Sequence, residues 1–392
     1  MKKIAIIEPI GGHGGNDIYD FNLIHSINRQ PECNAVLYTC NETQVVGLDD
    51  VELTYKNVFG KSNKFIRAFN YFRGTITSLI NAKKRKTSIV HLHFFGFNLL
   101  EYFNLYAAKK LFGFHVVGTA HDIESFEKYA RGDASRHDYE KFFALFDEVV
   151  VHTEYARREL INHISNDVFD ADKIRTIYAC DLDYDNLDSN FIEKSVAREY
   201  LKLPKERKII LFFGQIKKVK GLDLLLKAFG KVVKQDPNLL LVIAGKVWKD
   251  DYSEYAKIIE EHRLEKFVDQ RISFIDNKDV SFYFNAADII VLPYRKIYNS
   301  GVLIRAMSFG TPVVASNFGP FEEFIKDGEN GYLFEAENTD NLAKKLEVAL
   351  NDQNKLDKVS IEEKTFIKKN FALEEIGKQY CKLYRSILEE VK

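Results

Sequence analysis

Residues 208–229, with the sequence KIILFFGQIKKVKGLDLLLKAF, contain a strand, a loop and a helix in succession. The apolar run Lys208–Phe213 has the length of a buried strand, and the segment after the loop has apolar side chains at helical spacing. The loop itself contains two glycines and the three lysines Lys217, Lys218 and Lys220. Because ligands of open parallel sheets bind at the carboxyl ends of strands, this loop favours a phosphate-bearing ligand, although a solvated basic loop has the same composition.

The same alternation of strand and helix runs through the whole chain. In the first half, short apolar runs predict strands at Lys3–Ile7, Ala35–Thr39, Ile89–His93, His115–Thr119 and Glu148–Thr153. In the second half, they predict strands at Lys208–Phe213, Leu239–Ala244, Ile272–Ile275, Ile289–Pro293 and Pro312–Ala315. Helical patterns lie between the runs, which indicates parallel sheets covered on both faces. The sequence therefore predicts an α/β protein with two doubly wound, Rossmann-like domains.

Domain boundaries follow from a polar stretch between the two halves, Asp181–Arg207. We predict a first domain over residues 1–190 and a second over residues 191–372. The last helix, over residues 373–392, has apolar side chains at helical spacing and is expected to pack back on the first domain. A ligand is expected in the cleft between two such domains.

Composition excludes several classes of protein. Lys and Arg total 56 against 57 Asp and Glu in 392 residues, and this net charge of −1 argues against a protein that coats nucleic acid. None of the four cysteines forms a CxxC pair, so neither a disulfide framework nor a structural zinc site is expected. The first apolar run ends at Glu8, too early for a signal peptide, and no run approaches the ~18 residues of a membrane span. We therefore expect a cytoplasmic protein.

Two motifs of the first half place polar groups at strand ends. Gly12, Gly14 and Gly15 belong to a glycine-rich loop whose backbone amides can approach an anion, and a tight turn is the alternative. His121 and Asp122 follow a buried strand, where the imidazole can hydrogen-bond a sugar hydroxyl or move a proton. A capping Asp beside a structural histidine explains this pair equally well.

A second candidate loop of the second half begins a helix near Ser300. Ser300 can cap that helix, which would point the amides of Gly301 and Val302 at an anion. We expect this loop and the loop beginning at Gly214 to close on the same phosphates. Asp181–Asp183 has the form of a metal-binding DxD motif but lies in the linker, so no metal site is expected.

The segment from Leu53 to Leu100 contains no Asp or Glu. Phe65, Phe69, Phe72, Ile76 and Leu79 recur at helical spacing, beside the basic residues Lys64, Arg67, Arg73, Lys83, Lys84 and Arg85. Such a helix can lie in an anionic membrane interface or contact an anionic acceptor. The alternative is that the phenylalanines pack on the sheet and the basic residues are solvated.

Several stretches carry a resemblance to a known family: Phe213–Phe229, Ala286–Tyr294 (AADIIVLPY), Ser300–Ser316 (SGVLIRAMSFGTPVVAS), Glu322–Phe334 and, in the first half, Gly118–Asp122 (GTAHD). They resemble retaining glycosyltransferase family 4. The resemblance implies a metal-independent enzyme of the GT-B fold, with the nucleotide-sugar donor on the second domain and the acceptor on the first. It assigns the donor diphosphate to the residues Gly12 to Gly15, Gly214, Lys217, Lys220 and Ser300 to Val302, and places His121 near the sugar.

One part of the family pattern is missing. The family has two glutamates eight positions apart, and the corresponding residues here are Ile297 and Arg305. The second glutamate grips the nucleotide ribose, and an arginine cannot accept those hydroxyl hydrogen bonds. Arg305 can instead add positive charge near phosphate, which leaves both a retaining and an inverting reaction open.

These observations predict a hexosyltransferase-type glycosyltransferase with no cofactor beyond its donor. It would move a sugar from a nucleotide-diphosphate sugar to a hydroxyl of a glycan or lipid-linked acceptor in cell-surface polysaccharide synthesis. We expect it in the cytoplasm, in peripheral contact with the anionic inner face of the plasma membrane, and without nucleic acid as a partner. A non-catalytic GT-B binding or scaffold protein is the alternative from another class, and a sugar-nucleotide epimerase or hydrolase is the alternative enzyme.

Overall fold

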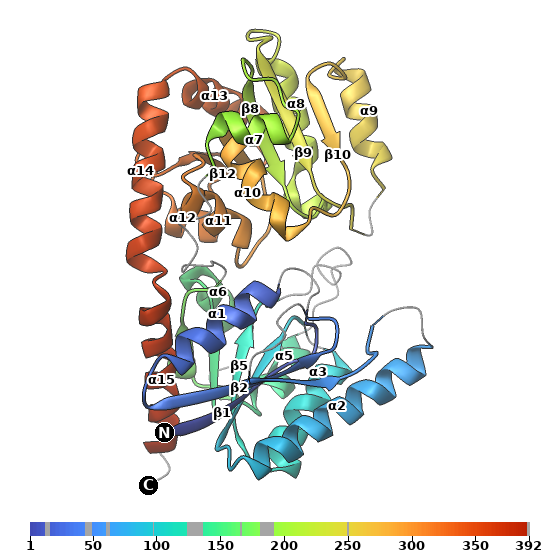
Figure 1. Ribbon diagram of the computed structural model, residues 1–392, viewed down its shortest axis with the longest axis vertical. Helices are drawn as coiled ribbons and strands as arrows, with labels where there is room; N and C mark the ends of the chain where they lie inside the picture. Colours follow the sequence, from blue (N-terminus) through green and yellow to red (C-terminus); the bar gives the residue numbers. More distant parts are fainter. Residues whose placement is uncertain are drawn as a thin grey trace. The chain divides into compact units, whose positions relative to one another are not determined.

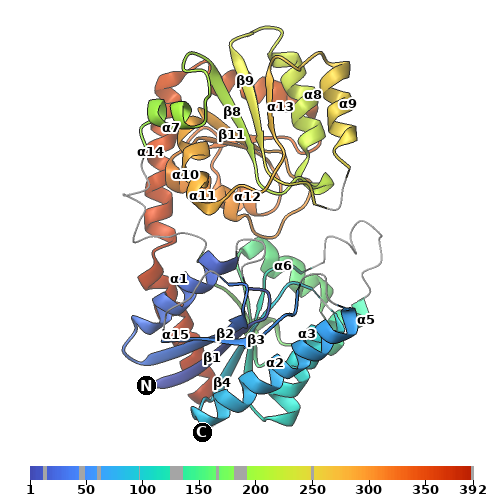
Figure 2. The ribbon, with the colours of Figure 1, turned by 45° about the vertical axis from the view of Figure 1, so that its right-hand side comes forward.

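A computed structural model describes residues 1–11, 16–43, 49–59, 63–96, 98–123, 136–164, 167–180, 192–248 and 251–389 (Figures 1 and 2). Its contacts divide the chain into two compact units. Unit 1 consists of Met1–Asp181 together with Phe371–Lys392, and unit 2 consists of Leu182–Asn370. Along the described part of the chain, no helix is both long and apolar enough to cross a membrane.

Unit 1 is built on a seven-stranded parallel sheet in the order β3-β2-β1-β4-β5-β6-β7. Its strands are β1 (Lys2–Glu8), β2 (Cys33–Cys40), β3 (Val51–Tyr55), β4 (Ile89–Phe94), β5 (His115–Ala120), β6 (Glu148–Val151) and β7 (Ile174–Thr176). Its helices are α1 (Asn16–Asn28), α2 (Lys64–Lys84), α3 (Leu99–Tyr106) with a π-helical turn (Ala107–Leu111), α5 (Arg136–Phe143), α6 (Glu154–His163) and α15 (Leu373–Glu389), and a 3₁₀ turn is formed by Ala171–Lys173.

The last helix, α15, belongs to unit 1 and lies beside α1 (Figure 1). A Cβ added to Gly377 would lie 2.1 Å from the carbonyl oxygen of Ser26, so the two helices approach closely because position 377 has no side chain. The hydroxyls of Tyr19 and Tyr380 are 3.1 Å apart, which joins α1 to α15 by a buried hydrogen bond. These contacts place the C-terminal helix on the first domain's fold.

Unit 2 repeats the architecture with a six-stranded parallel sheet in the order β10-β9-β8-β11-β12-β13. Its strands are β8 (Lys208–Phe213), β9 (Leu239–Ala244), β10 (Val268–Arg271), β11 (Ile289–Leu292), β12 (Val313–Ser316) and β13 (Tyr332–Phe334). Its helices are α7 (Lys194–Tyr200), α8 (Leu222–Val232), α9 (Ser253–Glu261), α10 (Asn277–Ala286), α11 (Gly301–Phe309), α12 (Pro320–Phe324), α13 (Thr339–Leu350) and α14 (Gln353–Asn370). A 3₁₀ turn (Lys218–Lys220) precedes α8.

Both sheets have the strand order of a doubly wound nucleotide-binding fold, in which the first strand lies between the second and the fourth. In each unit the chain winds outward from this first strand in one direction and then in the other. The predicted α/β class with two Rossmann-like domains is therefore confirmed. The strands Lys208–Phe213 and Leu239–Ala244 have the predicted boundaries.

One predicted strand, Ile272–Ile275, is wrong: the strand is β10, over Val268–Arg271. β10 lies at the edge of the sheet and pairs with β9, so its polar side chains can point away from the core. Asp269 and Arg271 form an ion pair at 2.9 Å along this strand. The apolar run 272–275 has the composition of a strand, but it forms the connection between β10 and α10 and is not assigned to a strand.

Candidate functional site

The loops after β8 and β11 meet at the point where the strand order of unit 2 reverses. β8 and β11 are neighbours in the sheet, and the connections that follow them wind in opposite directions. In open α/β sheets, ligands bind in the crevice at the carboxyl ends of the two strands at such a point. Both second-half loops that the sequence analysis singled out therefore lie where the fold places a ligand.

The loop after β8 is held by backbone hydrogen bonds on one side and by close packing on the other. The amide of Ile216 donates to the carbonyl of Lys246 at 2.9 Å, and the amide of Trp248 donates back to Ile216 at 3.1 Å. Gly221 ends the loop with a φ of 67° and begins α8. A Cβ on Gly221 would lie 1.9 Å from the carbonyl oxygen of Pro293, at the end of β11. The two loops are thus in direct backbone contact.

Two of the loop's lysines lie over aromatic rings. The Nζ atom of Lys220 is 3.7 Å from the ring centroid of Tyr294, which follows β11, and the Nζ atom of Lys217 is 5.2 Å from that of Trp248. A ring face attracts an ammonium group without neutralising its charge. Both lysines are therefore positioned at the carboxyl edge of the sheet.

Arg295 joins the two loops. Its guanidinium donates to both carboxylate oxygens of Asp223 in α8, each at 2.8 Å, and to the carbonyl of Lys218 at 2.8 Å. Its hydrogen bonds to the Asp223 carboxylate raise the pKa of the Arg295 guanidinium above its ordinary value. These contacts hold the 3₁₀ turn that contains Lys220 against the end of β11. The ion pair was not predicted from the sequence, because Arg295 and Asp223 are 72 residues apart.

Ser300 caps α11 as predicted, since its Oγ accepts a hydrogen bond from the amide of Leu303 at 3.2 Å. The cap occupies the third amide of the helix, so the amides of Gly301 and Val302 are those that the first turn offers to an anion. A Cβ on Gly214 would lie 3.5 Å from Cγ2 of Val302. The start of α11 and the loop after β8 are therefore neighbours, and their contact with one shared phosphate group stays a prediction.

The two positions where the family pattern has glutamates lie on either side of Ser300. Ile297 is only 5% exposed and packs in the interior, so it has no role as a polar ligand. Arg305 lies in the second turn of α11 and is half-buried. The charge at this position is thus opposite to that of the family's glutamate, and contact of Arg305 with the donor stays a prediction.

In unit 1, His121 is half-buried and belongs to a cluster of rings. It stacks on Phe95 at a centroid distance of 4.6 Å, and its ring centroid is 5.1 Å from those of His93 and His152. Burial lowers the pKa of His121 well below its ordinary value, and the neighbouring His152 and His93 lower it further. The imidazole is therefore neutral at pH 7, and its Nε2 atom has no hydrogen-bond partner within the described ranges.

Other members of this cluster have structural roles. His91 is hydrogen-bonded to Tyr384 of α15 and to Thr119 of β5, each at 2.7 Å, which agrees with its interpretation as a structural histidine.

Asp122 follows His121 directly and is half-buried. Gly12, Gly14 and Gly15 lie outside the described residues. His152 was not foreseen, because only the packing of parallel strands brings β6 next to β5.

Glu8, at the end of β1, is a polar residue of unit 1 that sequence reasoning did not assign to a site. It is fully buried, and its carboxylate accepts hydrogen bonds from the amides of Gly11 at 2.6 Å and Ile10 at 2.9 Å. Burial raises the pKa of Glu8, and the nearby Asp20 raises it further. The sequence feature that could have indicated this role is an acidic residue shortly before a glycine-rich loop.

Among the described residues, no three His, Cys, Asp or Glu side chains gather to hold a metal ion.

The basic and aromatic segment forms α2, but its phenylalanines do not share one buried face. Phe65 and Phe69 are 73% and 66% exposed, whereas Phe72 packs on Phe103 with a centroid distance of 4.5 Å. The buried face is instead made of smaller residues, namely Gly74, Thr75, Ser78, Leu79 and Ala82. The alternative that the phenylalanines pack on the sheet is therefore wrong for Phe65 and Phe69. The helix approaches the sheet instead at Gly74, where an added Cβ would lie 2.5 Å from the ring of Tyr55.

The six basic residues of this segment differ in their surroundings. Arg85 pairs with Glu52 at 2.7 Å, and Nζ of Lys83 lies 4.2 Å from the ring centroid of Phe114, so both are engaged inside unit 1. Lys64, Arg73 and Lys84 are exposed, and Arg67 is half-buried. The exposed Lys64 thus lies in the first turn of α2, next to the exposed Phe65.

Known proteins resemble this chain in sequence and in structure. Residues 193–365, within unit 2, match the family model described as glycosyl transferases group 1. N-acetyl-alpha-D-glucosaminyl L-malate synthase of Bacillus anthracis is 25% identical over 323 residues, which are 79% of this chain and 78% of that protein. For five other curated relatives the chain spans about half their length, between 45% and 55%.

Solved structures resemble the chain over its full length. Sucrose-phosphate synthase from Thermosynechococcus elongatus has a TM-score of 0.81 at 19% identity, with 100% of both chains covered. Anabaena HepE in complex with UDP has a TM-score of 0.74 at 17% identity, with 98% of this chain and 100% of that chain covered. The chain therefore has the GT-B fold of two Rossmann-like domains, and its residues 193–365 match the glycosyl transferases group 1 family.

Proposed function

We propose that the protein is a glycosyltransferase that moves a hexosyl group from a nucleotide-diphosphate sugar to a hydroxyl of a glycan or lipid-linked acceptor. The observation that carries the proposal is the meeting of Lys220, Lys217 and the start of α11 at the switch point of unit 2. Two cations and two helix amides there suit a diphosphate. The similarity to glycosyl transferases group 1 and the UDP complex of a protein with the same fold support the same ligand.

The proposed chemistry breaks the bond between the sugar's anomeric carbon and the diphosphate oxygen and joins that carbon to the acceptor oxygen. The proton of the acceptor hydroxyl passes to the departing diphosphate or to solvent. Negative charge builds on the departing diphosphate, and fixed positive groups that face it lower the barrier. Lys217, Lys220 and the first amides of α11 supply those groups, and the proposal includes no metal ion. In unit 1, the proposal gives neutral His121 a hydrogen bond to a hydroxyl of the sugar.

The proposal is tested by calorimetric titration of the full chain with UDP, GDP, ADP, dTDP and CMP, followed by transfer assays with the matching nucleotide sugars. We expect one nucleoside diphosphate to bind with a dissociation constant on the order of micromolar, and its sugar to be transferred to a lipid-linked acceptor from cell-surface polysaccharide synthesis. Analysis of the product's anomeric configuration then decides between retention and inversion. Absence of binding by all five nucleotides, with and without acceptor, would contradict the proposal.

A non-catalytic binding protein on the same fold is the second candidate, and Arg305 in place of the ribose-binding glutamate favours it. It predicts nucleotide binding or partner binding without turnover of any sugar donor. An epimerase or hydrolase predicts that the sugar nucleotide is altered without an acceptor. The same transfer assay, run with and without acceptor, separates these outcomes.

We also propose that α2 brings the protein into peripheral contact with the anionic inner face of the plasma membrane. Asn63 caps this helix, since its side chain accepts a hydrogen bond from the amide of Phe65 at 2.8 Å. In the first turns of the helix, Phe65, Ile66 and Phe69 are exposed beside Lys64. Exposed phenylalanines beside basic residues and without acidic neighbours match an anionic bilayer surface. No Asp or Glu occurs from Leu53 to Leu100.

Replacing both Phe65 and Phe69 by Ser is expected to lower partitioning onto phosphatidylglycerol vesicles by about tenfold or more, because each ring loses its burial in the interface. Vesicle co-sedimentation measures this. Phe274→Ser is the matched control, since Phe274 is 69% exposed and lies in unit 2. Equal binding of the wild type and the double variant would refute this membrane contact.

A further inference from the structure

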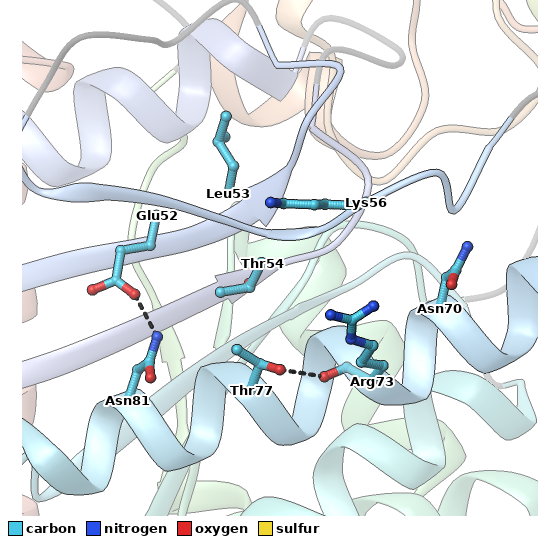
Figure 3. A pocket seen from close by; sticks show the side chains of 8 residues that line it. All are labelled: Glu52, Leu53, Thr54, Lys56, Asn70, Arg73, Thr77 and Asn81. Atoms are coloured by element: carbon cyan, nitrogen blue, oxygen red, sulfur yellow. Dashed lines mark hydrogen bonds between the residues drawn. The ribbon is translucent and has the colours of Figure 1, made fainter.

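We infer that unit 1 carries a second ligand site, a pocket between β3 and α2 that binds a phosphate group borne by a hydroxylated molecule. The pocket has a volume of about 390 Å³ and is lined by residues of β3, α2 and the residue after β3 (Figure 3). It lies within unit 1, whereas the proposed donor site is in unit 2, so the two proposals stand or fall separately.

Two cations give the pocket its charge. Lys56 extends into the space from the strand side and Arg73 from the helix (Figure 3). Both side chains are exposed, and neither forms an ion pair with a carboxylate of the described ranges. An anion that enters the pocket therefore displaces no internal partner and relieves the repulsion between two like charges.

Glu52 is the carboxylate of the lining, and it is already engaged. Its Oε2 accepts from Nδ2 of Asn81 at 2.7 Å, and its Oε1 accepts from Nε and Nη2 of Arg85 at 3.0 and 2.7 Å. The pair with Arg85, whose two nitrogens donate to the same oxygen, balances the charge of Glu52 at one end of the pocket. The positive charge of Lys56 and Arg73 therefore stays uncompensated at the other end.

The remaining lining indicates what accompanies the anionic group. It consists mainly of neutral hydrogen-bonding side chains, with Leu53 as the apolar exception. The Thr77 hydroxyl donates to the carbonyl of Arg73 at 2.8 Å, and Nδ2 of Asn70 donates to the carbonyl of Asn57 at 3.3 Å. Both side chains thus keep oxygen lone pairs as acceptors, which suit the hydroxyl donors of a sugar or polyol. Phosphorylated sugars and the headgroup of phosphatidylglycerol share this chemistry.

The test compares the wild type with the double variant Lys56→Gln/Arg73→Gln, which removes both pocket charges at exposed positions. Probes are glucose 6-phosphate in calorimetry, with the donor site saturated by its nucleoside diphosphate, and phosphatidylglycerol vesicles in co-sedimentation. We expect the double variant to weaken binding of at least one probe by about tenfold, and the wild-type affinity to fall as salt rises. Lys110→Gln/Lys141→Gln removes two exposed charges of unit 1 outside the pocket and is expected to change binding by less than about twofold.

The two probes identify the source of the phosphate. Loss of glucose 6-phosphate binding in the pocket variant indicates a soluble sugar phosphate, and loss of vesicle binding alone indicates a lipid headgroup. If neither probe distinguishes the pocket variant from the wild type, or if the control variant loses as much affinity, the site is refuted. Nucleotide binding in unit 2 is measured in the same samples and is expected to be equal in all of them, which separates failure of this site from failure of the donor site.

Discussion

Lys220→Ala is expected to lower kcat/KM for sugar transfer by a factor of about 10²–10³, which is the usual cost of removing one group that stabilises developing negative charge. The Nζ atom lies 3.7 Å from the ring centroid of Tyr294, which follows the end of β11. A methyl side chain at this position supplies no charge to the departing diphosphate. Initial rates with the cognate nucleotide sugar measure the effect.

Lys218→Ala is the matched control for this variant. Lys218 is in the same 3₁₀ turn and has the same charge, but its side chain is exposed. We expect its removal to change kcat/KM by less than about fivefold, since an exposed charge is screened by solvent. Similar losses in both variants would mean that the loop contributes only general positive charge, and the specific role of Lys220 would be withdrawn. Circular dichroism shows whether each variant is folded.

The same variant separates binding from catalysis. If Lys220 stabilises the diphosphate mainly as it departs, kcat falls more than the affinity for the donor, because only charge that develops in the transition state is lost. If it holds the ground-state diphosphate equally well, KM rises and kcat is nearly unchanged. Calorimetry with the nucleoside diphosphate, which resembles the product, gives the affinity independently of turnover.

Much of the fold was predictable because buried parallel strands leave a local signal. Lys208–Phe213 and Leu239–Ala244 are apolar throughout and appear in the structure with the predicted ends. β10 was misplaced because an edge strand tolerates polar residues such as Asp269 and Arg271, which remove the signal. β3 was missed for a similar reason, since Tyr55 is its only buried residue and Leu53 at its centre is exposed.

Only those parts of the candidate site that lie within one short stretch of sequence could be predicted. Ser300 and the lysines of the loop after β8 are recognisable from neighbouring residues. The contacts that position them are not, because Arg295 reaches Asp223 across 72 residues and Lys220 reaches the ring of Tyr294. The exposure of Phe65 could not be predicted either. Helical spacing shows which residues share a face of the helix, but it does not show which face packs on the sheet.

Gly221→Ala is expected to destabilise unit 2 by about 3 to 5 kcal/mol in total and to abolish nucleotide binding. About 1–2 kcal/mol comes from an alanine at a φ of 67°, and the rest from the clash of its Cβ, which would lie 1.9 Å from the carbonyl oxygen of Pro293. Because the position of Cβ is set by the backbone and its partner is a backbone carbonyl oxygen, no side-chain rotation relieves the clash. The loop with Lys220 must then move away from the end of β11.

Gly113→Ala separates the two contributions. Gly113 has a φ of 65°, but an added Cβ would meet no atom within 4 Å, so this variant has the conformational cost without the clash. We expect a loss of about 1–2 kcal/mol in unit 1 and unchanged nucleotide binding. Urea unfolding followed by the fluorescence of Trp248, the single tryptophan of the chain, reports on unit 2, and far-ultraviolet circular dichroism reports on both units. If Gly221→Ala costs no more than Gly113→Ala and still binds nucleotide, the loops after β8 and β11 are not in backbone contact, and the proposed diphosphate site loses its geometric basis.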